Sequence, residues 1–455
     1  MNNHAFKRAT KIEEIQSVLA PRPLTREELG ILFEETFQAR DPHSLRRDEI
    51  ATCLKTGNMA KVLVTGHPGS GKSTELVKFQ EEHASEYTFV SFSFLKEAQL
   101  SQASIESLLV LIVETLVREF RRLDVPLDEK PLEQVYNWFS ETFDIHEREL
   151  DMGLALGGGA DTKDTFWGKL LGLSAYLKSD IKAGSRTLNR SVTKENKRLS
   201  ELAFQCNEVI REALLGIRNR QLPDLVIIIE DLDKVSPEAA DAIFIQNPAP
   251  LTDLGCRIIF TAPISLLSNP RAGGLDSSGF SKVGIPMIRV CERDGGPCKE
   301  GREVLRKILD SRLDVNRLID TDALDLAVEK TGGVLRHLFE ALGKAAETVS
   351  QGLSRKTRQL AKIQKQDVRY GLNRLRAELV ARVGSWNLPE EYKEHDITTK
   401  SMWERVRELS KKPRRLEPDP LNMLLLEGHA IIEYNGEGWH RVHPLIQEHL
   451  LEEMT

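Results

Sequence analysis

Short apolar runs are the most regular feature of the first 290 residues. These runs cover 61–65, 225–229, 257–261 and 285–290. Continuous runs of this kind predict strands that are buried on both faces, as in a parallel sheet. The stretches between the runs are long enough for helices, so the pattern predicts a doubly wound α/β core.

Beyond residue 290 the pattern becomes helical and then indicates a short hairpin. Asn435 and Gly436 stand between the strand-like segments 430–434 and 439–442. Asn-Gly between β-forming residues is a strong hairpin signal. Helices are expected at 304–313, 321–330, 366–381, 401–410 and 420–427, with a closing helix near 443–446.

Composition narrows the class of protein without identifying it. The 455 residues include 63 Lys+Arg and 69 Asp+Glu, for a net charge of -6, and 40% of them are hydrophobic. This is an ordinary globular composition with room for several domains. The charge balance excludes an overall basic coat but leaves local basic patches open. No apolar run reaches the ~20 residues of a membrane span and the amino terminus lacks a secretory signal, so a cytoplasmic protein without membrane contact is expected.

Cysteine usage agrees with a reducing compartment. The five cysteines are odd in number and widely spaced, with neither a CxxC pair nor a histidine at zinc-binding distance. We expect free thiols at Cys53, Cys206, Cys256, Cys291 and Cys298.

A glycine-rich turn follows the strand at 61–65 and leads into a helix. Its spacing, Gly66-x4-Gly71-Lys72-Ser73, fits the phosphate-binding pattern GxxxxGK[ST] in full. Such a loop turns its N–H groups around phosphates, Lys72 reaches the β- and γ-phosphates, and the Ser73 hydroxyl contacts Mg²⁺. The turn therefore predicts binding of ATP with Mg²⁺. The expected nucleotide-binding residues are Gly66, His67, Pro68, Gly69, Ser70, Gly71, Lys72, Ser73 and Thr74.

Acidic residues follow the apolar run at 225–229. The carboxylates of Glu230 and Asp231 should lie at the carboxyl edge of the sheet, where ligands of parallel sheets bind. The expected metal site comprises Ser73, Glu230 and Asp231. Within it we expect Glu230 near the metal and Asp231 orienting the attacking water. Asp233 is either a second carboxylate behind these two or a helix cap ahead of residues 236–238.

Together these motifs resemble those of AAA+ and STAND ATPases, and in particular of replication initiators of the origin-recognition type. That resemblance implies a P-loop NTPase core, a helical lid and slow ATP hydrolysis. It assigns Thr261, at the end of the 257–261 strand, to sensor 1. It assigns Arg336, in a Gly-x-x-Arg element that begins at Gly333, to sensor 2, which contacts the γ-phosphate from the lid. Lys72, Glu230, Asp231, Thr261 and Arg336 are thus the expected catalytic residues. Arg271 is a weak candidate for an arginine finger and fits a solvated loop charge better.

The helices and hairpin after residue 381 resemble a winged-helix domain. Replication initiators use such a module to bind double-stranded DNA, whereas many STAND ATPases pack it against the nucleotide domain. The basic segment Lys411, Lys412, Arg414 and Arg415 could neutralise DNA phosphates or form a solvated linker. Two functions stay open: a DNA-loading, initiator-like ATPase, and a signalling or defence ATPase with a protein trigger.

The expected domains are 1–50 as an N-terminal helical segment, 51–290 as the P-loop core, 291–380 as the lid and 381–455 as the winged-helix-like domain. The core carries a helical, basic insertion at about 144–220. Cations recur there at every fourth position: Lys178, Lys182, Arg186, Arg190, Lys194 and Arg198. We hypothesise that this stripe contacts a partner, namely a nucleic acid, a second copy of the chain in a self-oligomer or an effector protein.

Overall fold

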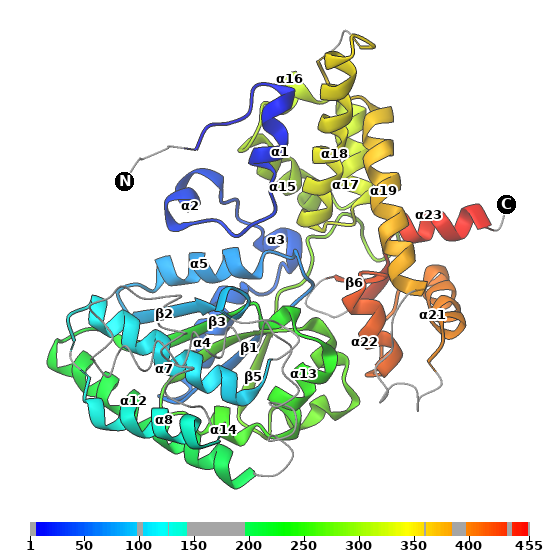
Figure 1. Ribbon diagram of the computed structural model, residues 1–455. Coiled ribbons are helices and arrows are strands. Elements are labelled where there is room, and N and C mark those ends of the chain that lie inside the picture. The colour runs from blue at the N-terminus through cyan, green and yellow to red at the C-terminus, as the bar shows by residue number, and fades with distance from the viewer. Residues whose placement is uncertain are drawn as a thin grey trace.

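The computed structural model describes residues 6–97, 103–125, 127–142, 196–358, 361–384, 397–434 and 439–453. A five-stranded parallel sheet lies inside its lower lobe (Figure 1). The strands are β1 (Lys61–Thr65), β2 (Tyr87–Ser93), β3 (Asp224–Glu230), β4 (Arg257–Ala262) and β5 (Phe280–Gly284). Their order is β2-β3-β4-β1-β5, and every neighbouring pair is parallel. The turn after β1 therefore leaves from the interior of the sheet.

Helices cover both faces of this sheet. Alternate residues of β3 belong to different hydrophobic cores: Ile227 and Ile229 pack with one set of helices, and Val226 and Ile228 pack with the other. This period of two explains why a continuous apolar run forms a strand. One face carries α7 (Ile105–Arg122), α8 (Glu129–Thr142) and α12 (Asn196–Asn219), and the other carries α4 (Arg46–Lys55) and α5 (Lys72–Glu82). The doubly wound P-loop NTPase fold is confirmed.

Short elements connect the strands. After β2 comes α6 (Phe94–Glu97). Between β3 and β4 lie η5 (Leu232–Lys234), α13 (Pro237–Asp241), the π-helix η6 (Ala242–Gln246) and α14 (Ala249–Thr252). Between β4 and β5 lie η7 (Ile264–Ser268) and η8 (Pro270–Gly274).

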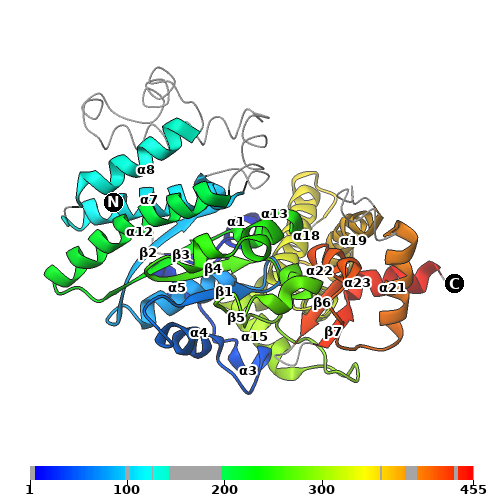
Figure 2. The ribbon, with the colours of Figure 1, turned by 90° about the horizontal axis from the view of Figure 1, so that it is seen from below.

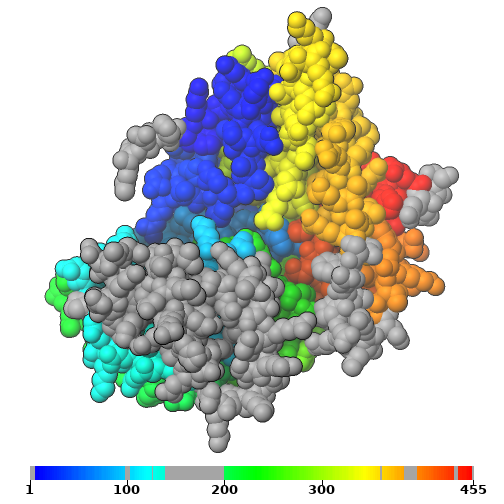
Figure 3. Space-filling view, viewed as in Figure 1, coloured from blue at the N-terminus to red at the C-terminus, as the bar shows by residue number. Residues whose placement is uncertain are grey.

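A helical lid follows the sheet. It consists of α15 (Lys299–Asp310), α16 (Val315–Leu318), α17 (Thr321–Lys330), α18 (Leu335–Ser354) and α19 (Lys365–Gly384). The N-terminal elements are η1 (Ile12–Glu14), α1 (Ile15–Val18), α2 (Arg26–Leu32) and α3 (Phe37–Arg40). Ile12 and Ile15 share one hydrophobic core with the lid, and Figure 3 shows the N-terminal segment lying against the lid. The beginning of the chain therefore supports the lid.

The last elements form the winged-helix module. They are α21 (Thr399–Lys411), α22 (Pro420–Glu427), the antiparallel hairpin β6 (Ile431–Tyr434) and β7 (Trp439–Val442), and α23 (Pro444–Glu453). Arg414 adds an isolated antiparallel bridge to His440 at the edge of the hairpin. Figure 2 shows α22 and the hairpin on the side toward the sheet and α21 on the outer side. The lid and winged-helix parts of the expected fold are confirmed.

The structure corrects one strand and confirms the free thiols. The run at 285–290 forms no strand, because Pro286 has no N–H and β1, the neighbour in the sheet, ends at Thr65. The last strand is instead β5, just ahead of that run. All five cysteines are free.

Three expectations concern residues that are not all described. The cation stripe lies outside the described residues except for its last member, Arg198, which is in α12. The hairpin turn at 435–438 and most of the insertion at 144–220 also lie outside them. Within the described ranges, no helix is both long and apolar enough to cross a membrane.

Candidate functional site

The turn between β1 and α5 has the conformation that its glycines allow. Gly66, Gly69 and Gly71 all have positive φ angles, of 149°, 83° and 97°. A Cβ on Gly66 would lie 2.5 Å from the carbonyl oxygen of Ile285, so only glycine fits there. Gly71 directly precedes α5, so the helix N-terminus with its positive dipole end faces the turn.

A cavity of about 630 Å³ opens beside this turn. Most of the predicted phosphate, metal and lid residues line it: Gly69, Gly71, Lys72, Ser73, Thr74, Glu230, Asp231 and Arg336. Thr261 is fully buried instead, and its Oγ1 donates to the Ile229 carbonyl 3.4 Å away. The fold thus brings the β1, β3 and lid motifs to one cavity, whereas the Thr261 hydroxyl is engaged in the sheet.

Lys72 lies folded against its own loop. Its Nζ donates to the carbonyl oxygens of Gly66 at 2.7 Å and His67 at 3.0 Å. The same Nζ forms an ion pair with Asp233 Oδ2 at 2.7 Å. Asp233 lies in η5 and lines the cavity, so it belongs to the site and does not serve as a remote helix cap.

The β3 carboxylates have different surroundings. Burial raises the pKa of Glu230, and the neighbouring Asp231 and Asp233 raise it further, while the Ser73 hydroxyl lowers it. Burial also raises the pKa of Asp231, but hydrogen bonds from Lys234 and Ser93 outweigh it, so the net shift is downward. The division of work between these two carboxylates stays a prediction.

These residues suit a divalent cation. Ser73 and Glu230 offer oxygen ligands side by side, and Glu230 is a half-buried carboxylate whose raised pKa a bound cation would offset. A bound Mg²⁺ would supply charge neutralisation for phosphate oxygens. The part that this chain contributes is the placement of the two oxygen ligands beside the phosphate-binding turn.

The lid brings Arg336 against the turn. A Cβ on Gly69 would lie 2.8 Å from the Arg336 Cβ, so the two backbones are in close contact. Gly333 makes this approach possible, because a Cβ there would lie 1.9 Å from the Ile288 carbonyl oxygen. The Gly-x-x-Arg element therefore holds a cation at the cavity wall through tight backbone packing.

Part of the cavity wall is apolar and was not predicted from sequence. Its wall includes side chains from the N-terminal segment and from the lid: Leu24, Leu32, Phe33, Ile308, Leu335 and Phe339. Such a wall can accept a flat heteroaromatic base while phosphates occupy the polar end. The residues come from in and around α2, from α15 and from α18, and they share no motif, so no local pattern marks them.

Arg40 was also missed, although it contacts the turn directly. Its Nη2 donates to the Ser70 carbonyl at 2.6 Å and its Nε to Thr36 Oγ1 at 2.7 Å. Burial lowers the pKa of Arg40, and the nearby Glu75 carboxylate opposes that shift. The N-terminal segment therefore fixes the backbone of the turn through a buried guanidinium.

The winged-helix module also contacts the turn. The Nε2 of His429 lies 2.8 Å from the Pro68 carbonyl, which can only accept, so Nε2 carries the proton. The backbone N–H of Glu433 donates to His67 Nε2 at 2.9 Å, so His67 carries its proton on Nδ1. Both imidazoles are buried, and their Nδ1 atoms have no partner among the described residues.

A second histidine pair joins the module to the lid. Leu445 N–H donates to His443 Nδ1 at 3.2 Å, so His443 donates from Nε2 to His337 Nδ1 at 3.1 Å. Burial lowers the pKa of His443 to about 3 and that of His429 to about 4. The pKa values of His67 and His337 are lowered well below their usual range for the same reason. Four neutral imidazoles thus hold turn, lid and winged helix together.

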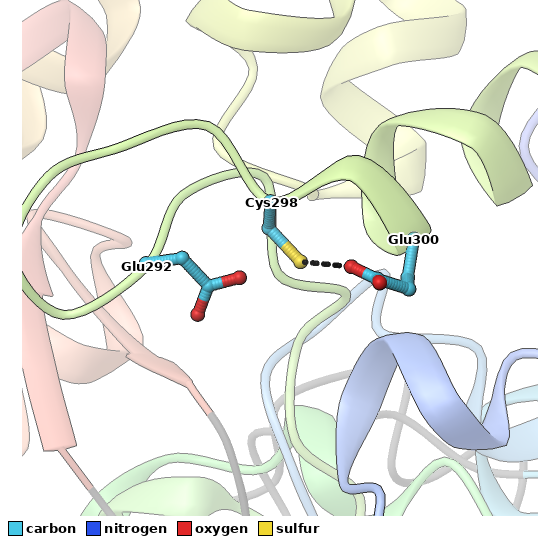
Figure 4. A group of neighbouring side chains, drawn as sticks. All are labelled: Glu292, Cys298 and Glu300. Atoms are coloured by element: carbon cyan, nitrogen blue, oxygen red, sulfur yellow. Dashed lines mark hydrogen bonds between the residues drawn. The ribbon is translucent and has the colours of Figure 1, made fainter.

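One cluster outside the cavity has the composition of a metal site. Glu292, Cys298 and Glu300 bring their ligand atoms within 4.8 Å of one another (Figure 4). Cys298 Sγ hydrogen-bonds Glu300, and Arg289 forms an ion pair with Glu292 at 3.3 Å. Burial raises the pKa of Cys298 to about 11, which disfavours the thiolate that would bind a metal. These contacts account for the cluster without an ion.

Comparisons with known proteins give distant matches in structure only. No family model matches the sequence, and no curated protein matches it. Cdc6p from Pyrobaculum aerophilum is similar at 14% identity and a TM-score of 0.39, over 96% of this chain and 98% of that one. A Walker-type ATPase of Pyrococcus abyssi is similar at 13% identity and a TM-score of 0.35, over 95% and 99%.

The Orc1 protein of Aeropyrum pernix, solved in complex with DNA, is similar at 14% identity and a TM-score of 0.36, over 96% of each chain. At these scores the likeness carries no inference about activity. The assignment of a P-loop NTPase fold with a lid and a winged helix rests on the strands, turn and cavity of this chain itself.

Proposed function

We propose that this protein is an ATP-driven switch that binds ATP with Mg²⁺, hydrolyses it slowly and changes the docking of its winged helix. The observation that carries this proposal is the pair of hydrogen bonds from the winged helix to His67 and Pro68. Both residues belong to the phosphate-binding turn. A ligand that reshapes the turn therefore acts directly on the contacts that hold the module.

The lid supplies the second half of the switch. Arg336 and Gly69 are in van der Waals contact, and His337, the next residue, bonds His443 of the winged helix. A γ-phosphate that attracts the Arg336 guanidinium would shift this turn of the lid and its histidine together. Binding energy at the phosphate thus becomes a change in the stability of the docked module.

Burial of α22 supports the packed form of the module over a DNA-bound one. Leu421 to Leu426 are all buried, and Asp419 N–H donates to the Ser268 carbonyl of η7 at 2.9 Å. Ser265 N–H, also in η7, donates to Glu427 at 3.3 Å. The helix that precedes the hairpin is thus used for contacts within the chain while the module is docked.

Two variants test the proposed site. Lys72→Ala should abolish binding of a fluorescent ATP analogue, because it removes the phosphate-contacting cation. Asp231→Asn should retain binding and block phosphate release. A parental rate of hydrolysis in Lys72→Ala would refute the site. Small-angle scattering of the parent with and without ATP should show expansion, and Lys72→Ala should show none.

DNA binding by the released module is a second candidate. Lys411, the last residue of α21, is exposed, and so are Lys412 and Arg415 in the segment between α21 and α22. Exposed cations of this kind bind backbone phosphates in a salt-dependent manner. Titration of duplex DNA at two salt concentrations, with and without ATP, separates the candidates. Affinity that rises with ATP and falls when these residues are neutralised favours DNA, and no affinity in either state favours a protein partner.

A further inference from the structure

The ammonium group of Lys72 is fully occupied within the chain. An ammonium has three N–H donors, and three acceptors surround this one: two carbonyl oxygens of the turn and the Asp233 carboxylate. A phosphate oxygen can therefore accept a hydrogen bond from Lys72 only if one of these three contacts is broken.

Asp233 is the partner whose loss matters most. The carbonyl oxygens of Gly66 and His67 are neutral, whereas Asp233 carries the charge that balances Lys72. The side chains of Lys72 and Asp233 are only 4% and 9% exposed, so water screens their attraction weakly. Within the described ranges, no other cation forms an ion pair with Asp233. The pair is a self-contained, buried salt bridge at the polar end of the cavity.

A nucleotide phosphate and Asp233 are competitors for the same cation. When a phosphate engages Lys72, Asp233 loses its partner and its negative charge then faces another anion. Separation of a buried ion pair is costly, and the repulsion that follows adds to the cost. Asp233 should therefore weaken nucleotide binding, which is the opposite of what a carboxylate that holds Mg²⁺ would do.

We propose that Asp233 is a positioning residue that holds Lys72 away from the phosphate site and promotes release of the bound nucleotide. The proposal rests on the proposed function, since it concerns the same site. It assigns to this carboxylate a role in setting nucleotide affinity, distinct from the metal and water roles expected of Glu230 and Asp231.

Titration with a fluorescent ADP analogue in EDTA tests the proposal. Because EDTA removes divalent cations, a role of Asp233 in metal binding cannot contribute to the measured affinity. Asp233→Asn should bind the analogue about tenfold more tightly than the parent. Asp233→Glu, which keeps the charge, should bind it close to the parental level. Equal or weaker binding by Asp233→Asn overturns the proposal.

Two controls separate this role from a merely structural one. Asp241→Asn removes a different buried carboxylate, which pairs with Arg271 outside the cavity, and should leave ADP affinity unchanged. Thermal unfolding of each variant checks folding, and Asp233→Ser provides the same test if Asp233→Asn does not fold. A parent that binds no ADP refutes the proposed function, whereas a parent and Asp233→Asn with equal affinity refute only the role of Asp233.

Discussion

His429 donates a hydrogen bond from Nε2 to the carbonyl oxygen of Pro68, 2.8 Å away, and so joins the last domain of the chain to its phosphate-binding turn. The two residues are 361 positions apart. The bond uses a main-chain oxygen of the turn, so its geometry depends on the conformation of the turn itself. A change in that conformation therefore alters a hydrogen bond that holds the winged helix.

Replacement of His429 by leucine should weaken the docked state by about 1–2 kcal/mol, because the Pro68 carbonyl loses its donor. Chemical denaturation should report the loss, and small-angle scattering should show a larger radius without nucleotide. His449→Leu is a suitable control, since the His449 ring lies tilted against Trp403, with the ring centroids 5.6 Å apart. Similar effects of the two variants would argue against a latch at His429.

Acidification should open the interface. Burial lowers the pKa of His429 and His440 to about 4 and that of His443 to about 3, whereas an unfolded histidine titrates near 6.5. The unfolded state then binds more protons than the native state. The histidines' contribution to the free energy of unfolding is therefore fully present above about pH 6.5 and falls as the pH drops toward 4. Each histidine contributes up to about 1.4 kcal/mol per pH unit in this range.

Two half-buried glutamates act in the opposite direction. Burial raises the pKa of Glu427 and Glu433 to about 7, so their contribution is lost as the pH rises from about 4.5 to 7. The histidines outnumber these glutamates, so the net stability should still fall on the acid side. Denaturation midpoints from pH 4.5 to 8 check this, and a midpoint that rises steadily toward pH 4.5 would contradict it.

Gly69→Ala should impair both folding and nucleotide binding. Its φ of 83° disfavours any side chain, and a Cβ would press on Arg336 at 2.8 Å. We expect a loss of about 1–3 kcal/mol and weaker binding of an ATP analogue. Gly343→Ala is the matched control, because Gly343 lies in α18 with open space around it and should gain about 0.5–1 kcal/mol. Equal effects of the two changes would exclude steric contact with Arg336 as the cause.

Glu427→Gln should make the docked state less sensitive to nucleotide. The Glu427 carboxylate accepts from Ser265 N–H at 3.3 Å, and Lys72 favours its ionised form while Asp233 disfavours it. Movement of Lys72 toward a phosphate removes a positive charge that stabilises the ionised Glu427 carboxylate. The neutral amide of glutamine does not respond to this change in charge. Scattering with and without ATP should show a smaller ATP-induced expansion than in the parent. An undiminished expansion would show that Glu427 does not respond to Lys72.

The sequence predicts those parts of the fold and site that depend on contiguous residues. The turn from Gly66 to Ser73 and the carboxylates after β3 were found because each is a local motif on a regular element. The lid arginine, Arg336, lies in a Gly-x-x-Arg element whose first residue, Gly333, is required by the close approach to Ile288.

Contacts between distant segments could not be predicted in this way. Arg40 reaches the Ser70 carbonyl and His67 accepts from Glu433, but no spacing or periodicity relates these partners. Asp233 was recognised as part of an acidic group, yet its pairing with Lys72 depends on how η5 turns back over the phosphate-binding loop. Such pairings follow from the packing of whole domains, which a single sequence does not encode locally.

The chain that leaves the sheet after β5 is itself joined to the hairpin. Met287 N–H donates to the Glu433 carbonyl at 3.3 Å, and the Tyr434 hydroxyl donates to the Gly332 carbonyl at 2.6 Å. Release of the winged helix must break these contacts at the same time as the histidine bonds, since His429 and His443 directly flank the hairpin that carries Glu433 and Tyr434. Release should therefore be all-or-none, so that a sample partly saturated with ATP is a mixture of fully closed and fully open molecules without half-released forms.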